Sequence, residues 1–327
     1  MHVNIYDMVN QYRHLSPNLE SVSVTPDSRG ILQLQRKFDV LYVFGDSLSD
    51  LGNAFDATEK ATGEGSPPSP PYFQGHFSNG LVWVEYLALF LGLTANRSTN
   101  FAVGGANTGS ANTMIPNNPL NLPGLQQQID NFTASVKESR QDANSPDLYI
   151  VWAGGNDYLG GDVTHPTLPI QNLSNAVSSL AKIGARNILV LNLPDLGLVP
   201  LTRNNPEQSI LLNELTKAHN TGLAKALDAL KFSCGESVDI LLFDVNSIFS
   251  QIMNNPAKFG FTNVTDAELD QIAQSQQGTD KFFFWDGLHP TTTSHLILAK
   301  AVFSVLCSDG VSELNAEEFA PVGGAFI

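Results

Sequence analysis

The sequence predicts an α/β fold in which a central, mostly parallel sheet is covered by helices on both faces. Three observations lead to this prediction. Short apolar runs typical of buried strands alternate along the chain with longer segments whose apolar residues recur every three to four positions. This alternation favours crossover connections, which join parallel strands. The chain has 327 residues, 42% of them hydrophobic, so it can build a substantial core.

Five apolar runs are predicted as the strands of a five-stranded sheet: residues 40–44, 100–103, 148–152, 188–193 and 238–243. Helices are predicted between and after these runs, and several of them begin beside Ser, Asn or Pro, as helices commonly do. The predicted helices cover residues 77–91, 125–138, 170–183, 206–232 and 292–306.

Two stretches interrupt the alternation and are predicted as loops. Residues 58–74 are rich in Gly and Pro, and residues 110–124 are rich in Asn and Pro. Ligands of open α/β sheets bind beyond the carboxyl ends of the strands, and both loops follow such ends. We therefore expect either walls or a lid over a site, or plain connections. We further expect a single domain over residues 37–327, preceded by an extension over residues 1–36.

The charge balance argues against one class of partner. The chain has 17 basic and 32 acidic residues, a formal net charge of −15, which repels polyphosphate backbones, so nucleic acid is not an expected partner. No run reaches the ~18 apolar residues of a membrane span, so no transmembrane segment is expected. The first thirty residues lack the basic start and apolar run of a signal peptide. On its face this predicts a cytoplasmic protein, or a secreted one if a leader has been removed.

The chain has two cysteines, Cys234 and Cys307, which lack the paired spacing of a zinc or redox site. Two buried thiols are favoured over a disulfide. No metal and no organic cofactor is expected.

Ser47 is a candidate nucleophile. It follows the predicted strand 40–44 and the pair Gly45-Asp46, at a point where a buried strand surfaces and turns toward a helix. Gly45 tolerates unusual dihedral angles, and backbone N–H groups at a helix start can donate to an anion. A Gly-Asp-Ser turn is also ordinary turn chemistry, so the hypothesis depends on the residues that could activate Ser47.

A serine hydroxyl needs a base to accept its proton, and a carboxylate to orient that base. His289 and Asp286 are the candidates, because Asp286 lies three residues before His289 and one turn can bring the two side chains together. Pro290 keeps His289 out of the following helix. His295 is a rival base, but it lies inside the predicted helix 292–306 and is interpreted as a structural histidine.

Two further segments can supply donors to the oxyanion of a tetrahedral intermediate, and each donor of this kind contributes roughly 3–4 kcal/mol. Gly104-Gly105 follows the predicted strand 100–103 and exposes backbone N–H groups, and Asn156 follows the predicted strand 148–152 with a side-chain amide. The candidate nucleophile and oxyanion donors therefore follow predicted strands, and the candidate acid and base follow the apolar run 282–285.

These segments resemble the four sequence blocks of the GDSL esterase and lipase family, also called SGNH hydrolases, and the resemblance spans residues 40–306. The matching blocks are Gly45-Asp46-Ser47-Leu48-Ser49-Asp50, Gly104-Gly105-Ala106, Gly155-Asn156-Asp157 and Asp286-Gly287-Leu288-His289-Pro290. Residues 75–80 and 192–197 are similar to stretches in the larger, lipase-like members of plants and bacteria.

The resemblance implies a flavodoxin-like, three-layer α/β/α fold and a Ser47–His289–Asp286 triad. It assigns the oxyanion hole to the backbone amides of Ser47 and Gly105 and the side chain of Asn156. The close Asp286–His289 spacing departs from the hydrolases with a G-x-S-x-G nucleophile elbow, whose acid and base lie far apart in sequence. The expected activity is hydrolysis of small-molecule or lipid-like esters. An acyltransferase of lipids, a carbohydrate O-acetylesterase and, less favoured, a non-enzymatic binding protein remain as alternatives.

Overall fold

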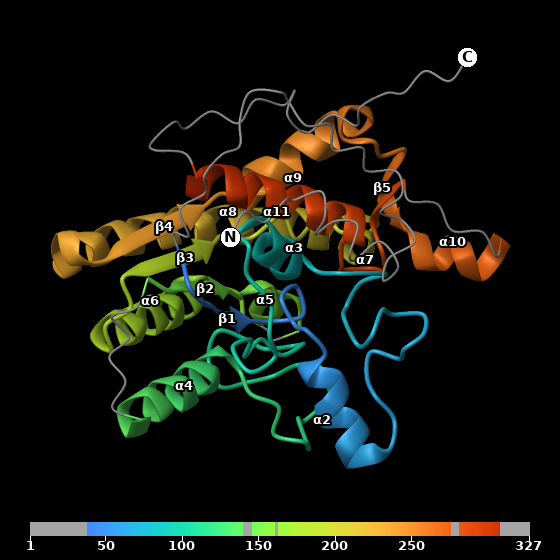
Figure 1. Ribbon diagram of the computed structural model, residues 1–327. Helices are drawn as coiled ribbons and strands as arrows, with labels where there is room; N and C mark the ends of the chain where they lie inside the picture. The colour runs from blue at the N-terminus through green and yellow to red at the C-terminus, as the bar shows by residue number, and fades with distance from the viewer. Residues whose placement is uncertain (1–37, 140–145, 161–162, 276–280, 308–327) are drawn as a thin grey trace, which may run out of the picture.

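The computed structural model describes residues 38–139, 146–160, 163–275 and 281–307. Its main sheet is parallel throughout and has the strand order β1-β2-β3-β4 (Figure 1). The bounds of these strands are Leu41–Gly45 for β1, Leu148–Trp152 for β2, Asn187–Leu191 for β3 and Asp239–Phe243 for β4. The α/β class is confirmed, and four of the five predicted strands are found within two residues of their predicted bounds. The predicted extension over residues 1–36 lies outside the described residues.

The predicted fifth strand, residues 100–103, is not a strand, so the expected strand count is wrong. These residues run beside β1 as an extended segment, with one parallel bridge between Val43 and Asn100. The backbone N–H of Phe101 donates to Val43 O at 2.7 Å. The pairing is irregular because side chains bind backbone groups of this segment. The Asn100 side chain accepts from the Ala102 N–H, and the Asn53 side-chain amide donates to the carbonyl oxygens of Asn100 and Ala102. If residues 100–103 are counted as the second strand along the chain, β1 is strand 1 and β2, β3 and β4 are strands 3, 4 and 5. The strands then lie side by side in the order 2-1-3-4-5, which is the order of flavodoxin-like folds.

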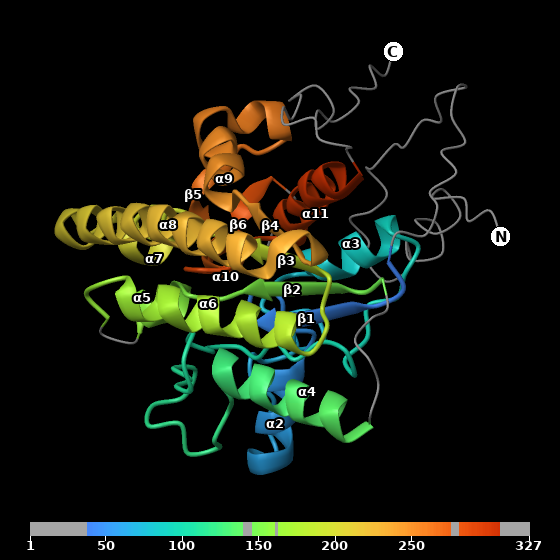
Figure 2. The same ribbon diagram turned by 90° about the vertical axis from the view of Figure 1, so that its left-hand side faces the viewer.

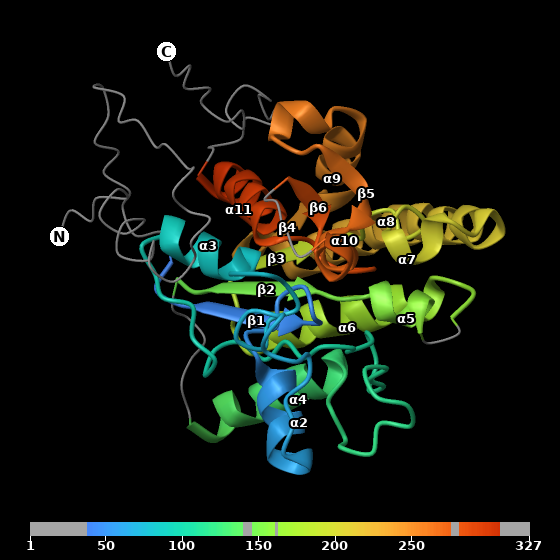
Figure 3. The same cartoon turned by 90° about the vertical axis from the view of Figure 1, so that its right-hand side faces the viewer.

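Helices cover both faces of the sheet, as predicted. One face packs against α3 (Trp83–Phe90), α9 (Val245–Asn254) and α11 (Thr292–Cys307). The other face packs against α4 (Leu125–Ser139), α6 (Thr167–Lys182) and α8 (Pro206–Cys234). Successive strand residues point to opposite faces, so Ile150 belongs to the first core and Val151 to the second. Figures 2 and 3 show α3 and α11 on one side of the sheet and α4 and α6 on the other.

Several elements were not predicted. They are α2 (Asn53–Thr62), α5 (Gly155–Leu159), α7 (Pro200–Arg203), α9, α10 (Glu268–Ser275), two short 3₁₀ helices (Gly235–Ser237 and Pro256–Phe259), and a two-stranded parallel sheet of β5 (Asn263–Ala267) and β6 (Phe282–Phe284). The loop predicted over residues 58–74 therefore starts as the end of α2. The helix predicted over residues 77–91 begins only at Trp83, because the Glu85 carboxylate accepts from the backbone N–H of Val82 and caps the helix there.

The prediction of two buried thiols is wrong. Cys234 carries a free thiol but is only half-buried, and Cys307 is exposed at the end of α11. Among the described residues, no helix is both long enough and apolar enough to span a membrane.

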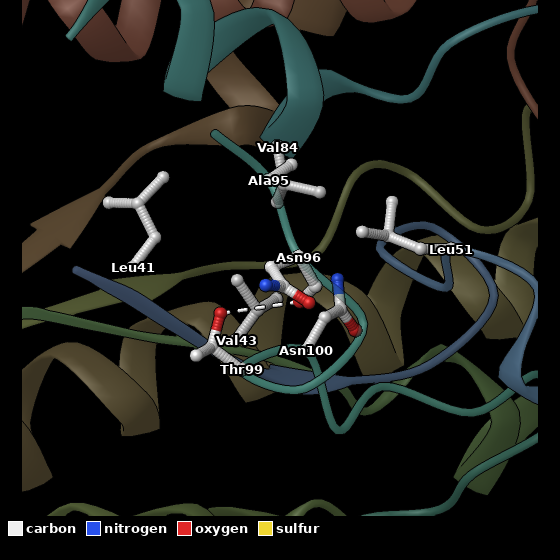
Figure 4. A pocket seen from close by; sticks show the side chains of 8 residues that line it. All are labelled: Leu41, Val43, Leu51, Val84, Ala95, Asn96, Thr99 and Asn100. Carbon is white, nitrogen blue, oxygen red and sulfur yellow. Dashed lines mark hydrogen bonds between the residues drawn. The ribbon is translucent and has the colours of Figure 1, made fainter. Parts of the chain in front are cut away.

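A small cavity lies between β1, α3 and residues 95–100 (Figure 4). Apolar side chains line most of it, including Leu41 and Val43 from β1 and Val84 from α3. It is large enough for about one water molecule. None of the candidate catalytic residues lines it, so it belongs to the packing of the fold rather than to the site.

Candidate active site

The candidate site lies at the carboxyl ends of β1 and β2, which are the neighbouring strands 1 and 3 of the 2-1-3-4-5 order. This is the point at which the strand order reverses, and open α/β sheets bind ligands in the crevice there. Ser47 follows β1 by two residues, and Asn156 follows β2 in the first turn of α5. The fold thus brings the first and third sequence blocks together.

Ser47, His289 and Asp286 form a continuous hydrogen-bonded chain. Ser47 Oγ lies 2.9 Å from His289 Nε2. His289 Nδ1 lies 2.7 Å from Asp286 Oδ2 and 2.9 Å from Asp286 Oδ1. All three side chains are largely buried, and Ser47 is 7% exposed. In this geometry the imidazole can take the hydroxyl proton of Ser47 while the carboxylate holds the opposite ring nitrogen.

The loop between β6 and α11 sets the position of Asp286 and His289. Asp286 Oδ1 accepts from the backbone N–H groups of Leu288 at 2.8 Å and His289 at 2.7 Å, so the carboxylate closes the turn from within. The backbone N–H of Trp285 donates to His289 O at 2.7 Å. The three-residue spacing between Asp286 and His289 therefore corresponds to a tight turn that the Asp286 carboxylate stabilises.

Burial and charge act on this pair in opposite directions. Burial alone would lower the pKa of His289, but the Asp286 carboxylate beside it, with a smaller contribution from Asp46, holds that pKa above its usual value. Burial would likewise raise the pKa of Asp286, but His289 and the two backbone N–H donors hold it well below its usual value. Asp286 is therefore ionised throughout the range in which His289 titrates.

The turn that carries Ser47 is braced by buried acids. Asp46 accepts from the backbone N–H of Leu48, and its burial raises its pKa to about 7. Asp50 accepts from three N–H groups at the start of α2 and also from the backbone N–H of Gly104, at 2.8 Å. A side chain at position 45 would place its Cβ 2.1 Å from Trp152 O, so only glycine allows β1 and β2 to approach this closely before Ser47.

Gly104 and Gly105 differ in what their N–H groups do. The Gly104 N–H is bound to Asp50, whereas within the described part of the chain the N–H groups of Gly105 and Ser47 have no protein acceptor. Gly105 has φ +76°, and a Cβ there would lie 2.4 Å from Met114 N, so the position requires glycine. The loop over residues 110–124 supports this turn: the Thr113 N–H donates to Gly105 O at 2.8 Å.

Asn156 directs its amide toward the same turn. Its Nδ2 donates to Ala106 O at 3.1 Å, and the amide retains a second N–H. The following residue, Asp157, accepts from the backbone and the hydroxyl of Thr108. Three hydrogen bonds therefore link the segment after β2 to the segment that contains Gly105.

A family model of the GDSL-like lipase/acylhydrolases matches residues 41–302, well over half of the chain. The chain belongs to this family. It follows that the protein is a hydrolase that acts on esters, as the sequence predicted.

Named relatives of this GDSL hydrolase span several activities. A phosphatidylcholine-sterol acyltransferase of Aeromonas hydrophila is 30% identical over 307 residues, 86% of this chain and 82% of the relative. An acetylesterase of Thermothelomyces thermophilus is 28% identical over 279 residues, 80% of this chain and 86% of the relative. A thermolabile hemolysin of Vibrio parahaemolyticus is 29% identical over 280 residues, 78% of this chain, and the match spans only 61% of the hemolysin.

His295, the rival base in the sequence of this GDSL hydrolase, does not join the hydrogen-bonded chain. It is 1% exposed inside α11, and among the described residues neither of its ring nitrogens has a hydrogen-bond partner. Burial lowers its pKa to about 3. The interpretation of His295 as a structural histidine agrees with this environment.

Sequence reasoning missed Tyr72. Its hydroxyl donates to Asp286 Oδ2 at 2.7 Å, across a separation of 214 residues. It lies in the Pro-rich stretch that was predicted to be either a wall over the site or a plain connection. The only signal in the sequence was the neighbouring segment 75–80, which resembles lipase-like members of the family but gives no indication of contact with Asp286.

Proposed function

We propose that this GDSL hydrolase cleaves acyl esters through a covalent acyl-enzyme on Ser47, with His289 as base and Asp286 as the acid that orients it. The observation that carries the proposal is the unbroken chain from Ser47 Oγ to His289 Nε2 at 2.9 Å and from His289 Nδ1 to Asp286 Oδ2 at 2.7 Å. No other histidine of the described chain is bonded to both a serine hydroxyl and a carboxylate.

In the first half-reaction, Ser47 Oγ attacks the ester carbonyl carbon and its proton passes to His289 Nε2. The tetrahedral intermediate collapses as His289 protonates the leaving alkoxide, so the C–O bond of the ester breaks and the alcohol departs. Water then attacks the acyl-enzyme, His289 takes a proton from it, and the carboxylic acid leaves as Ser47 regains its hydrogen. Asp286 remains ionised and stabilises the imidazolium in both halves.

We assign the oxyanion hole to the N–H groups of Ser47 and Gly105 and the free amide N–H of Asn156. The commitment of the Gly104 N–H to Asp50 supports the choice of Gly105. Each donor in such a hole lowers the activation barrier by roughly 3–4 kcal/mol.

For the substrate we propose carboxylic esters with an apolar acyl group, including lipid-like ones. Apolar side chains lie around the triad: Phe77 packs on the His289 ring with centroids 5.0 Å apart, and Leu48 and Leu288 flank the nucleophile and the base in sequence. An acyltransferase is the second candidate, because the Aeromonas relative that is 30% identical bears that name. A carbohydrate O-acetylesterase is the third, on the likeness to the fungal acetylesterase.

Ser47→Ala tests the reaction. It should reduce turnover of p-nitrophenyl esters by roughly 10³-fold or more and abolish labelling by a fluorophosphonate. Ser233→Ala is the matched control, since that exposed hydroxyl bonds only to Leu230 O at the end of α8. Near-normal hydrolysis or labelling by the Ser47 variant would refute the proposal.

A chain-length series from acetate to palmitate tests the substrate class. A maximum at long chains supports lipid-like esters, whereas a maximum at acetate favours the acetylesterase. Addition of an alcohol acceptor, with the products separated, measures acyl transfer against hydrolysis.

A further inference from the structure

The segment from Tyr72 to Asn79 runs along the loop that holds the acid and base. Four contacts join the two segments over a separation of more than 200 residues. They are the Tyr72 hydroxyl to Asp286 Oδ2 at 2.7 Å, the rings of Phe77 and His289 at 5.0 Å, Ser78 Oγ to Pro290 O at 2.9 Å, and the Thr292 N–H to Asn79 Oδ1 at 2.8 Å. Only the first of these contacts reaches a charged group of the triad.

The acceptor positions of Asp286 are divided between two sets of donors. Oδ1 accepts from the backbone N–H groups of Leu288 and His289, which hold the turn, and lies 2.9 Å from His289 Nδ1. Oδ2 makes the shorter contact with His289 Nδ1 and accepts from the Tyr72 hydroxyl. Asp286 Oδ2 therefore has two donors, His289 Nδ1 and the Tyr72 hydroxyl.

We propose that Tyr72 is a positioning residue of this site. Its hydroxyl fixes Asp286 Oδ2 toward His289 and takes a share of the negative charge that the carboxylate would otherwise direct at the imidazole alone. The inference rests on the proposed triad, and it adds a residue that acts on His289 only through Asp286.

The surroundings of Tyr72 keep its hydroxyl in place as a donor. Its ring meets the Trp285 ring edge to face, with centroids 6.1 Å apart, and its backbone N–H donates to Pro68 O. Burial, together with the charge of Asp286, raises the pKa of Tyr72 above its usual value, so the hydroxyl remains a donor at neutral pH.

A hydrogen bond to a carboxylate lowers its basicity, and a less basic carboxylate stabilises an imidazolium less. Tyr72 therefore moderates the rise in the His289 pKa that Asp286 causes, so that His289 remains a neutral base to lower pH. Three other ionisable groups are coupled to these residues: Asp46 acts on His289, the charge of His289 acts on His295, and Asp270 acts on Tyr72. A change confined to the Tyr72 hydroxyl leaves all three in place.

The test is the pH dependence of Ser47 labelling by a fluorophosphonate, which reports on His289 in the free enzyme without a choice of substrate. In Tyr72→Phe, the midpoint of the acid limb should move to higher pH by roughly half a pH unit or more, and the plateau rate should fall roughly 10-fold. Tyr42→Phe is the matched control. It removes a hydroxyl from a partly buried ring that stacks on Tyr149, and its profile should coincide with wild type.

A second variant gives the opposite sign and retains every contact of the ring. 3-Fluorotyrosine at position 72 is a stronger donor, so the acid limb should move to lower pH. An acid limb that stays in place or moves down in Tyr72→Phe, in protein with a wild-type melting curve, would overturn the proposal and leave Tyr72 as a packing residue. Labelling of Ser47→Ala by the fluorophosphonate tests the triad separately, because this variant would still be labelled only if Ser47 were not the nucleophile.

Discussion

Asp286→Asn separates the charge of the acid from its role in shaping the turn. The new amide has one oxygen and one NH₂ group to place where Asp286 has two equivalent oxygens. The backbone N–H groups of Leu288 and His289 both donate to the Oδ1 position, at 2.8 and 2.7 Å, so the amide oxygen should take that position. The NH₂ group then occupies the Oδ2 position, 2.7 Å from His289 Nδ1.

This orientation selects the wrong form of the base. An NH₂ group at 2.7 Å donates to an unprotonated Nδ1, so the proton of neutral His289 moves to Nε2, which can no longer accept from Ser47. The reverse orientation would leave two buried N–H groups facing an NH₂, at a cost of about 1–3 kcal/mol each, or roughly 2–6 kcal/mol together. At about 1.4 kcal/mol for each tenfold, the productive form falls by roughly 30-fold to 10⁴-fold. Loss of the negative charge beside the imidazolium lowers the rate further.

The assay is kcat/KM for a p-nitrophenyl ester from pH 5 to 9, with urea denaturation of the same samples. Asp286→Asn should lose at least 30-fold in kcat/KM and keep wild-type stability, because the turn retains its acceptor. Asp286→Ala should lose activity and also be destabilised by about 1–3 kcal/mol, since the two N–H groups lose their partner. Hydrolysis by Asp286→Asn within a few fold of wild type, at any pH in this range, would refute the reasoning.

Two further predictions concern the proposed oxyanion donor Asn156 and the buried histidine His295. Asn156→Ala should lower kcat and kcat/KM alike by roughly 10²–10³-fold; steady-state kinetics check this, and a change in KM alone would contradict the assignment. His295→Leu should keep hydrolysis within a few fold of wild type and make stability less sensitive to acid. Burial lowers the His295 pKa to about 3, so between its unfolded value near 6.5 and that value only the unfolded chain takes up the proton, and stability falls as the pH falls. Urea midpoints at pH 7 and pH 5 measure this, and an equal drop in wild type and variant would count against it.

The strands and long helices could be predicted because local pattern and final environment agree. The run Leu148–Trp152 is apolar at every position and buried on both faces, and it was predicted with its observed bounds. Residues 100–103 look similar in sequence, but side chains of Asn53 and Asn100 take the place of a regular ladder. Asn53 also belongs to a helix that was missed, α2, whose start depends on N–H donors to Asp50. Such contacts are not visible in apolar periodicity.

Some residues of the candidate site could likewise be predicted from the sequence, and others could not. Ser47, Asp286 and His289 could be named because each follows an apolar run with a recognisable local pattern, and the structure brings them within hydrogen-bond distance. Tyr72 could not be named, because its partner is 214 residues away and its own surroundings are turn-forming residues. The choice of Gly105 over Gly104 rested on the register of the family block. The contact between the Gly104 N–H and Asp50 now gives a physical reason for it.

The four hydrogen bonds of Asp50 have a consequence for how this enzyme can vary. One carboxylate joins the start of α2, directly after the nucleophile turn, to the glycine turn that follows residues 100–103. Asp50 therefore ties the segment of Ser47 to that of Gly105, and in the proposed mechanism this tie keeps the distance from the attacking oxygen to the Gly105 N–H the same for larger and smaller acyl groups. Adaptation to a new ester must come from the segments packed around these two, which leaves the geometry of bond cleavage unchanged while the substrate changes.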